Sequence, residues 1–320
     1  MDRPSSHQTF FASINANQRD ASPRLREVGI IKIANGADSD FDHAAFDPRT
    51  RRVFIAHTAR DCIEVIDHDT HKHIATLPGF PGVAGAVADD GDVLTTNRGA
   101  ATITWFDAAT YRIKAIFPSG PRPNGAAIVK RKNIGVAACI GDAQQGPVLQ
   151  VIDLKQATQR AIDLPGRPRW CVTDAEAQRI YLCIRNPSMV LVAGLPDLID
   201  IVCWGLPSGG AHGLDIDHAR QRLYAACDDG ALVELDSNTG KVMNVWPLAG
   251  VPDVTFFNPS TGLVHVAIGD PGLVETVDPL TGAIDRTVTG RGAHTTAIVI
   301  PDQLYVISPE HGGVLVLAAK

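Results

Sequence analysis

A unit of about 40–45 residues, containing four short apolar runs separated by turn residues, recurs along most of the chain. It is clearest between His212 and Gly250, where the runs are 213–217, 222–227, 231–236 and 241–248. Runs of about 4–8 residues rich in β-branched and aromatic side chains, bounded by Gly, Asp, Asn or Pro, are typical of β-strands. One such unit cannot bury both of its faces alone, so neighbouring units must pack against it.

Equivalent positions in successive units show how many copies there are. The first run of each unit starts at Asp42, Ala84, Asn124, Arg169, His212, Asp253 and His294. An Asp ends the third run in most units, at Asp67, Asp107, Asp153, Asp236 and Asp278. Its carboxylate can accept hydrogen bonds from the backbone of the turn that follows. Seven starts of a four-stranded unit predict an all-β, seven-bladed propeller.

The C-terminal unit supplies only three of its four strands. The run Glu27–Ile33 near the N-terminus resembles the fourth strand of the other units. We therefore predict that this run pairs with the C-terminal blade and closes the ring, which removes an open sheet edge. The predicted organisation is a polar N-terminal arm over residues 1–26, whose composition permits disorder, and a single propeller over residues 27–320.

Two segments, LYAAC…LDSNTGKV and TVDPLTGAI, carry a resemblance to a known family. They resemble the YVTN or YncE-like repeats of seven-bladed β-propellers, and the similarity covers about residues 27–320. The resemblance implies the fold. Lactonases, lyases and interaction scaffolds are more distant neighbours of that family, so the resemblance leaves the activity open.

Composition excludes several classes of protein. The net charge of −6 provides no basic surface for nucleic acid, and no apolar run reaches the roughly 18–20 residues of a membrane helix. Residues 1–26 lack the apolar core of a secretory signal, so we expect a cytoplasmic location with no membrane or nucleic-acid partner. Six cysteines without C-x-x-C spacing predict buried, reduced thiols, with Cys171, Cys183 and Cys203 slow to react. No phosphate-binding loop is present, and we expect neither a nucleotide nor a flavin.

The principal candidate site consists of His212, Asp253 and His294, which occupy the same repeat position in three consecutive blades. Ring geometry brings equivalent positions of adjacent blades together at the mouth of the central channel. Two imidazoles and a carboxylate can ligate a divalent ion such as Zn, Mn, Mg or Ca and leave positions open for water or substrate. They can instead act as a general acid/base pair in which Asp253 orients a histidine. In either case these three residues are the catalytic candidates.

Polar residues near the same mouth are candidates for substrate binding. They are Arg122, Asn124, Arg167, Arg169, Arg291, Asp42 and His57. An arginine can hold a carboxylate or phosphate through two parallel hydrogen bonds. The structural alternatives are ion pairs across the ring for the arginines and a turn position for His57. Ala84 interrupts the axial set, Asp228-Asp229-Gly230 is interpreted as an ordinary tight turn, and His265 is assigned to the core between blades.

These features predict a polar, partly basic pocket at the channel mouth that binds a small anionic molecule. The family resemblance adds metal-assisted hydrolysis of the lactonase type, or lyase chemistry. The rival hypothesis is a non-catalytic scaffold that binds a protein or a ligand on a loop face. Stoichiometric metal in the purified protein would favour the enzyme, because a scaffold needs no axial ion.

Overall fold

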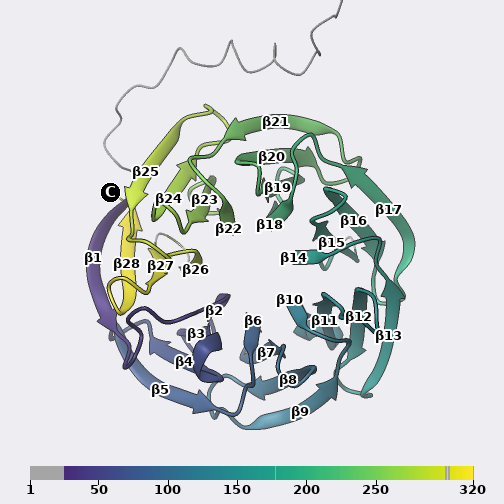
Figure 1. Ribbon diagram of the computed structural model, residues 1–320, viewed down its shortest axis with the longest axis horizontal. Helices are drawn as coiled ribbons and strands as arrows, with labels where there is room; N and C mark the ends of the chain where they lie inside the picture. The colour runs from purple at the N-terminus through teal and green to yellow at the C-terminus, as the bar shows by residue number, and fades with distance from the viewer. Residues whose placement is uncertain (1–24, 177, 300, 302, 320) are drawn as a thin grey trace, which may run out of the picture.

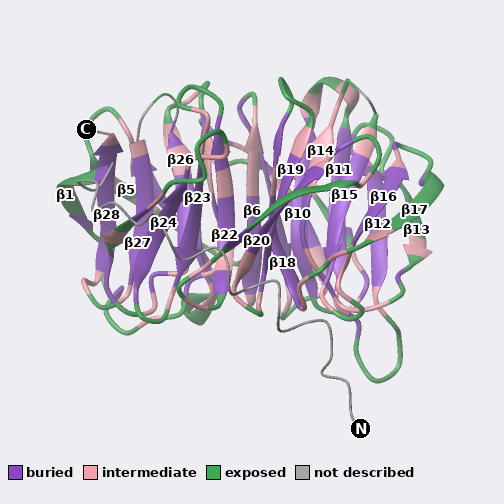
Figure 2. Ribbon diagram, turned by 90° about the horizontal axis from the view of Figure 1, so that it is seen from above, coloured by how far each residue is buried: buried purple, intermediate pink, exposed green. Residues whose placement is uncertain are grey.

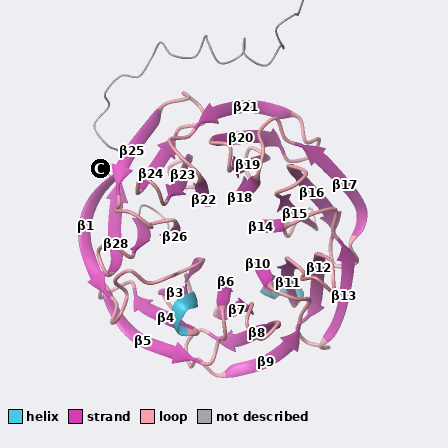
Figure 3. Cartoon of the chain, viewed as in Figure 1, coloured by secondary structure: helices cyan, strands magenta, loops and turns pink. Residues whose placement is uncertain are grey.

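Seven four-stranded antiparallel sheets are arranged around a central axis in the computed structural model (Figure 1). The structure describes residues 25–176, 178–299, 301 and 303–319. Two short 3-10 turns, Thr58–Arg60 and Lys130–Lys132, are the helical elements of this described part (Figure 3). The predicted all-β, seven-bladed propeller is confirmed.

Blades 1 to 4 each run from an inner strand to an outer strand in chain order. Blade 1 contains β2 (Ala44–Asp47), β3 (Arg52–His57), β4 (Cys62–Asp67) and β5 (Lys72–Pro78). Blade 2 contains β6 (Val83–Asp89), β7 (Asp92–Asn97), β8 (Thr102–Asp107) and β9 (Ile113–Pro118). Blade 3 contains β10 (Pro123–Val129), β11 (Ile134–Cys139), β12 (Val148–Asp153) and β13 (Thr158–Asp163). Blade 4 contains β14 (Pro168–Asp174), β15 (Arg179–Ile184), β16 (Met189–Gly194) and β17 (Ile199–Gly205).

Blades 5 and 6 repeat this order, and blade 7 combines the two ends of the chain. Blade 5 contains β18 (Ala211–Asp217), β19 (Arg222–Cys227), β20 (Ala231–Asp236) and β21 (Val242–Pro247). Blade 6 contains β22 (Pro252–Asn258), β23 (Leu263–Ile268), β24 (Leu273–Val277) and β25 (Ile284–Val288). Blade 7 contains β26 (Thr295–Val299), β27 (Gln303–Ser308), β28 (Gly313–Ala319) and β1 (Leu25–Lys32).

The ring is closed by β1, which pairs antiparallel with β28 from Leu25↔Ala319 to Lys32↔Gly313. The predicted closure is therefore confirmed, and the strand begins two residues earlier than the expected boundary at residue 27. Residues 1–24 of the predicted N-terminal arm lie outside the described residues. Within the described chain, no helix is both long enough and apolar enough to span a bilayer.

The Asp residues that end the third strands hold the turns that follow them, as predicted. In blade 1, Asp67 Oδ1 accepts hydrogen bonds from Thr70 N (2.8 Å) and Thr70 Oγ1 (2.6 Å). Asp236 makes the same pair of bonds with Thr239 in blade 5. The hydrogen bonds from Thr70 lower the pKa of Asp67, because they favour the ionised carboxylate.

Most inner strands begin with a bulge that brings neighbouring strand starts close together. In blade 5 the register between β18 and β19 shifts between Ala211 and Leu214, around His212 and Gly213. A Cβ atom on Gly213 would lie only 2.2 Å from the carbonyl oxygen of Asp253, so this position requires glycine. The missing side chain lets the start of β22 approach β18 and places Asp253 beside His212.

Buried side chains fill the blades, while the turns and much of the outermost strands are exposed (Figure 2). Five cysteines are buried as predicted, but Cys203 is exposed on the outer strand β17. The prediction for Cys203 was wrong because apolar composition does not identify a buried strand. The sequence of β17, IDIVCWG, is largely apolar, yet five of its first six positions are exposed.

Cys203 should therefore be the cysteine that reacts first with a thiol reagent in the native protein. Burial raises the pKa of Cys171 to about 12, which leaves almost no thiolate there. Counting labelled thiols by mass spectrometry after brief treatment with N-ethylmaleimide should give one adduct, at Cys203. Adducts at Cys171 or Cys183 with similar rates would contradict the placement of β15 and of the inner strand β14.

Candidate functional site

The starts of the inner strands and the loops after the second strands lie on one face of the ring, here called the proximal face. Backbone hydrogen bonds join the two kinds of loop within a blade. Arg98 N donates to Gly82 O (3.0 Å), Arg185 N to Arg167 O (2.8 Å), and Asp228 N to Gly210 O (2.8 Å). A side chain that leaves a second strand is therefore held next to one that enters an inner strand.

His212 is held between two carboxylates on the proximal face. Its Nδ1 lies 2.7 Å from Asp228 Oδ1, and its Nε2 lies 3.1 Å from Asp253 Oδ1. Burial alone would lower the pKa of His212, but the charge of Asp253 and the hydrogen bonds to both carboxylates outweigh burial and raise it. The raised pKa favours the imidazolium form, in which each ring nitrogen donates to one carboxylate and no lone pair is left for a metal, while the positive charge of Arg169, 3.4 Å from Nδ1, opposes that form.

Asp253 lies among three histidines. Burial would raise its pKa, but His212, then His294 and His43, hold the pKa of this carboxyl well below its usual range. Asp253 is therefore ionised at neutral pH. His43 comes from the start of blade 1, so the cluster spans a larger part of the ring than the three predicted blades.

His294 is close enough to influence Asp253 but is engaged elsewhere. Its Nε2 donates to the carbonyl oxygen of Phe41 at 2.9 Å. Among the described residues, one group of potential metal ligands has its ligand atoms within 4.8 Å of one another: His57, Cys62 and Glu64. The predicted set of His212, Asp253 and His294 does not meet this criterion. The role of His212, Asp253 and His294 as metal ligands stays a prediction.

Asp42 connects blade 1 to the loops of blades 2 and 3. Its Oδ1 lies 2.5 Å from His43 Nδ1, and its Oδ2 accepts from Arg98 at 2.6 Å. Arg98 also donates to the side-chain oxygen of Asn124. The His43 ring stacks on Trp170, with centroids 3.8 Å apart and planes 5° apart. Burial would raise the pKa of Asp42, but His43 and Arg98 lower it overall.

Five arginines, called here the arginine cluster, gather on the proximal face beside these residues. They are Arg98, Arg122, Arg167, Arg169 and Arg185. The pKa of Arg167 is lowered by burial first and then by the positive charge of the other four. This mutual influence shows that the five guanidinium groups share one region.

The arginine cluster carries more positive charge than its neighbours neutralise. Arg185 Nε donates to Asp228 at 2.6 Å, and Arg98 is paired with Asp42. Arg122 and Arg167 have no carboxylate within 4.0 Å in the part of the chain that the structure describes. The Nε atoms of Arg98, Arg167 and Arg169 are buried without a hydrogen-bond partner. Buried donors of this kind are normally satisfied, so three of them in one region are unusual.

Four residues of this region were not selected as site residues from the sequence: His43, Arg98, Arg185 and Asp228. Asp228 was assigned to an ordinary tight turn, but it bonds both His212 and Arg185. Three of the four directly follow a second strand, at Arg98, Arg185 and Asp228. Comparing the residues that follow the second strands of all blades, as was done for the starts of the inner strands, would have identified these three.

Two predicted substrate-binding residues lie apart from the arginine cluster. Arg291 lines an open cleft of about 590 Å³ next to Asp38, Asp40 and Glu310, so acidic groups surround it. His57 is fully buried at the end of β3. The other five predicted residues, Arg122, Asn124, Arg167, Arg169 and Asp42, belong to the arginine cluster or contact it.

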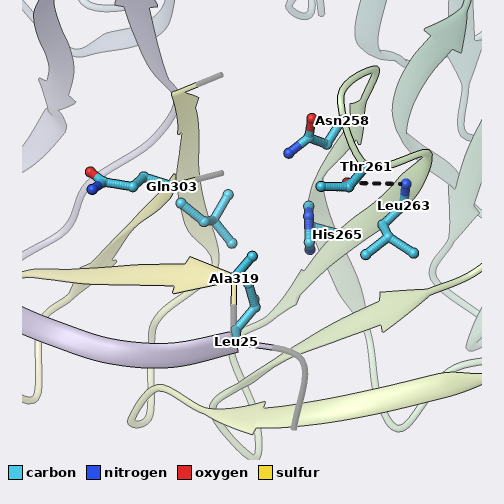
Figure 4. A pocket seen from close by; sticks show the side chains of 8 residues that line it. Leu25, Asn258, Thr261, Leu263, His265, Gln303 and Ala319 are labelled. Carbon is cyan, nitrogen blue, oxygen red and sulfur yellow. Dashed lines mark hydrogen bonds between the residues drawn. The ribbon is translucent and has the colours of Figure 1, made fainter. Parts of the chain in front are cut away.

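A small cavity between blades 6 and 7 is unrelated to this site (Figure 4). Its volume of about 20 Å³ has room for roughly one water molecule. His265 lines it and bonds Thr276 Oγ1 at 3.0 Å. Burial lowers the pKa of His265 to about 4, so this histidine is neutral, which confirms its assignment to the core between blades.

Two solved structures share the fold of this chain. Kuenenia stuttgartiensis hydrazine synthase aligns with a TM-score of 0.77 at 12% sequence identity, covering 88% of this chain and 97% of that chain. Streptogramin B lyase aligns with a TM-score of 0.77 at 11% identity, covering 92% of this chain and 97% of that chain. No protein-family model and no curated protein matches the sequence. At such low identity the similarity establishes the propeller fold alone.

Proposed function

We propose that the arginine cluster binds a small anionic molecule, such as a phosphate or a dicarboxylate, on the proximal face of the ring. The observation that carries this proposal is that Arg122 and Arg167 have no carboxylate within 4.0 Å in the described part of the chain, although three further arginines lie in the same region. The whole chain has a net charge of −6, so this positive region is a local feature. It would attract an anion and orient it through paired N–H donors.

Chemistry at this site would begin with His212. As an imidazolium ion between Asp228 and Asp253, it could protonate a leaving group while the arginines hold the anionic part of the substrate. Hydrolase chemistry of the lactonase type, or lyase chemistry, is the reaction class that we propose. The YVTN or YncE-like resemblance and the shared fold with streptogramin B lyase support this choice by analogy.

A metal-assisted reaction is a second form of this proposal, and it requires His212 to be neutral. His212 would have to lose a proton before its imidazole could ligate Zn, Mn, Mg or Ca alongside Asp253 and His294. Metal binding would then weaken as the pH falls, because protons compete for the imidazole. A stoichiometric divalent ion in the purified protein would favour this form.

Arg167→Gln should weaken the binding of phosphate and of malonate by at least about tenfold, since a hydrogen bond to a charged group contributes about 1.5–3 kcal/mol. Binding is measured by isothermal titration calorimetry at low ionic strength. Arg131→Gln is the matched control, because it removes the same charge from an exposed residue that pairs with Glu176. Equal weakening by both variants, or no binding by the wild type, would overturn the anion site.

A protein-binding scaffold is the second candidate function, and one observation favours it. The neighbouring outer strands β17 and β21 expose apolar side chains, at Ile199, Ile201, Val202, Val242, Met243 and Val245. Single exposed apolar residues are normal on a surface, but three on each of two outer strands in adjacent blades would suit a partner that contacts both strands. Under this hypothesis Arg167→Gln would leave partner binding unchanged.

A further inference from the structure

A serine, a histidine and a glutamate form a continuous hydrogen-bonded chain beside the proximal face of blade 1. Ser39 Oγ lies 2.8 Å from His57 Nε2, and His57 Nδ1 lies 2.8 Å from Glu64 Oε1. Ser39 is in the loop before β2, His57 ends β3, and Glu64 lies on β4. We propose that these three residues form a nucleophilic site that hydrolyses carboxylic esters. The proposal does not depend on the arginine cluster.

The direction of proton transfer follows from the state of Glu64. Burial alone would raise its pKa, but hydrogen bonds from His57, His73 and Thr76 outweigh burial and hold the pKa well below its usual range. The ionised carboxylate only accepts hydrogen bonds, so His57 Nδ1 carries a proton and donates it to Glu64. The lone pair of His57 therefore lies on Nε2, where it accepts the Ser39 hydroxyl hydrogen. This is the arrangement that activates a serine nucleophile.

The surroundings hold the histidine and the glutamate rigidly. The His57 ring is fully buried and stacks on Phe41, with ring centroids 4.0 Å apart. Glu64 Oε2 is bound by His73 Nε2 at 2.7 Å and by Thr76 Oγ1 at 2.5 Å. The orienting carboxylate is thus shielded from water, whereas Ser39, which is bonded to His57 Nε2, is half-buried and lines a cleft.

The repeat itself provides an internal comparison for this chain of residues. In blade 2, Asn97 and Thr104 occupy the positions of His57 and Glu64, and their hydrogen bond of 2.9 Å is a neutral link. The positions equivalent to Ser39 lie three residues before the repeat positions Ala84, Asn124, Arg169, His212, Asp253 and His294. They hold no serine in the other blades: Pro81, Pro121, Gly166, Gly209, Gly250 and Arg291. A purely structural link would need no ionised carboxylate, and blade 2 shows that a neutral pair suffices.

Ser39 opens onto a cleft that sets the class of substrate. The cleft has a volume of about 590 Å³ and is also lined by Asp38, Asp40, Arg291, His294 and Glu310. Three carboxylates against one guanidinium and one imidazole make it acidic, so it favours a neutral or cationic ester over an anionic one. This preference is opposite to that of the arginine cluster.

The reaction is balanced without any further reagent. Ser39 Oγ attacks the ester carbonyl carbon as its proton moves to His57 Nε2, and the protonated His57 then gives that proton to the departing alcohol oxygen. Water then attacks the acyl carbon as one of its protons moves to His57 Nε2, and that proton returns to Ser39 Oγ as the carboxylic acid is released. Both steps require Ser39 to move aside and uncover Nε2 of the buried His57. Asp40 N and Phe41 N donate no hydrogen bond within the described part of the chain, so they are candidate donors to the oxyanion.

A fluorophosphonate probe tests the proposal directly, because it labels an activated serine covalently. The intact protein should be labelled at Ser39, as located by peptide mass spectrometry, and should hydrolyse p-nitrophenyl acetate. Ser39→Ala should abolish the label and reduce hydrolysis at least about tenfold. Ser308→Ala is the matched control: Ser308 Oγ lies 2.8 Å from His311 Nδ1 but already donates to Thr289 O, so its loss should change neither readout.

Two further tests distinguish a catalytic role of Ser39 from a structural one: the variant Ser39→Cys, and a comparison of neutral and anionic esters. The cysteine variant should acquire a thiol that reacts with iodoacetamide faster than any native cysteine, since His57 would still accept the proton. Hydrolysis of the neutral p-nitrophenyl acetate should exceed that of the anionic p-nitrophenyl hemisuccinate. Absence of labelling in the folded wild type, or labelling at another serine, would overturn the proposal. Neither outcome would bear on anion binding by Arg167.

Discussion

Deletion of residues 1–33 should leave a protein that aggregates, whereas deletion of residues 1–24 should leave one that folds. The longer deletion removes β1, whose register with β28 extends from Leu25 to Lys32. It also removes the buried side chains of Leu25, Ile31 and Ile33. Burial of each such side chain stabilises a fold by about 1.5–3 kcal/mol, so the loss is comparable to the roughly 5–15 kcal/mol of a whole domain.

Without β1, strand β28 would lose its outer partner and become an open sheet edge along its full length. Open edges of this kind promote aggregation. The shorter deletion is the control, because it keeps every described strand. Soluble yield, size-exclusion chromatography and thermal unfolding of the two truncated proteins decide the matter. Similar melting temperatures for both would show that β1 contributes little, which would contradict the closure of the ring by this strand.

The fold could be predicted from the sequence because each blade repeats the same local chemistry. The turn carboxylates of Asp67, Asp107 and Asp236 form the expected hydrogen bonds, so a column of aspartates located the third strands correctly. The missing strand of the last blade could be found because the ring must close. Outer strands were harder, because β17 is apolar in sequence yet exposed.

The candidate site could be predicted only in part. Its contacts join two kinds of repeat position, the starts of the inner strands and the loops after the second strands, and only the first kind was compared between blades. Strand starts predicted that His212 and Asp253 lie near each other, and their side chains are 3.1 Å apart. The partners Arg185 and Asp228 come from loops after second strands, which vary freely in sequence between blades. Sequence spacing also cannot show that the pKa of His212 is raised, since that depends on the two carboxylates that face it.

His212→Gln should lower the free energy of unfolding by about 2 kcal/mol near pH 6, because it removes the cation that contacts both Asp228 and Asp253 and leaves only Asp228 with an ion-pair partner, Arg185. Glutamine keeps a similar volume but cannot carry the charge. The side chain of His212 is only 8% exposed and that of Asp228 11%, so water can compensate little. His218→Ala is the control: its ring is 58% exposed and lies 3.8 Å from Asp174, a geometry that contributes at most about 0.5 kcal/mol.

The difference in stability between wild type and His212→Gln should depend on pH in a definite way. The pKa of His212 is raised in the folded state, so its contribution is complete below its unfolded value of about 6.5 and is lost as the pH rises through the folded value. The pKa values of Asp228 and Asp253 are lowered, so their contribution is present above about 4 and is lost at more acid pH. Urea unfolding at several pH values should therefore show the largest difference between about pH 4 and 6.5. A difference that instead grows as the pH rises through about 6.5 would mean that His212 is neutral in the folded protein, which would restore a lone pair and with it the possibility of metal ligation.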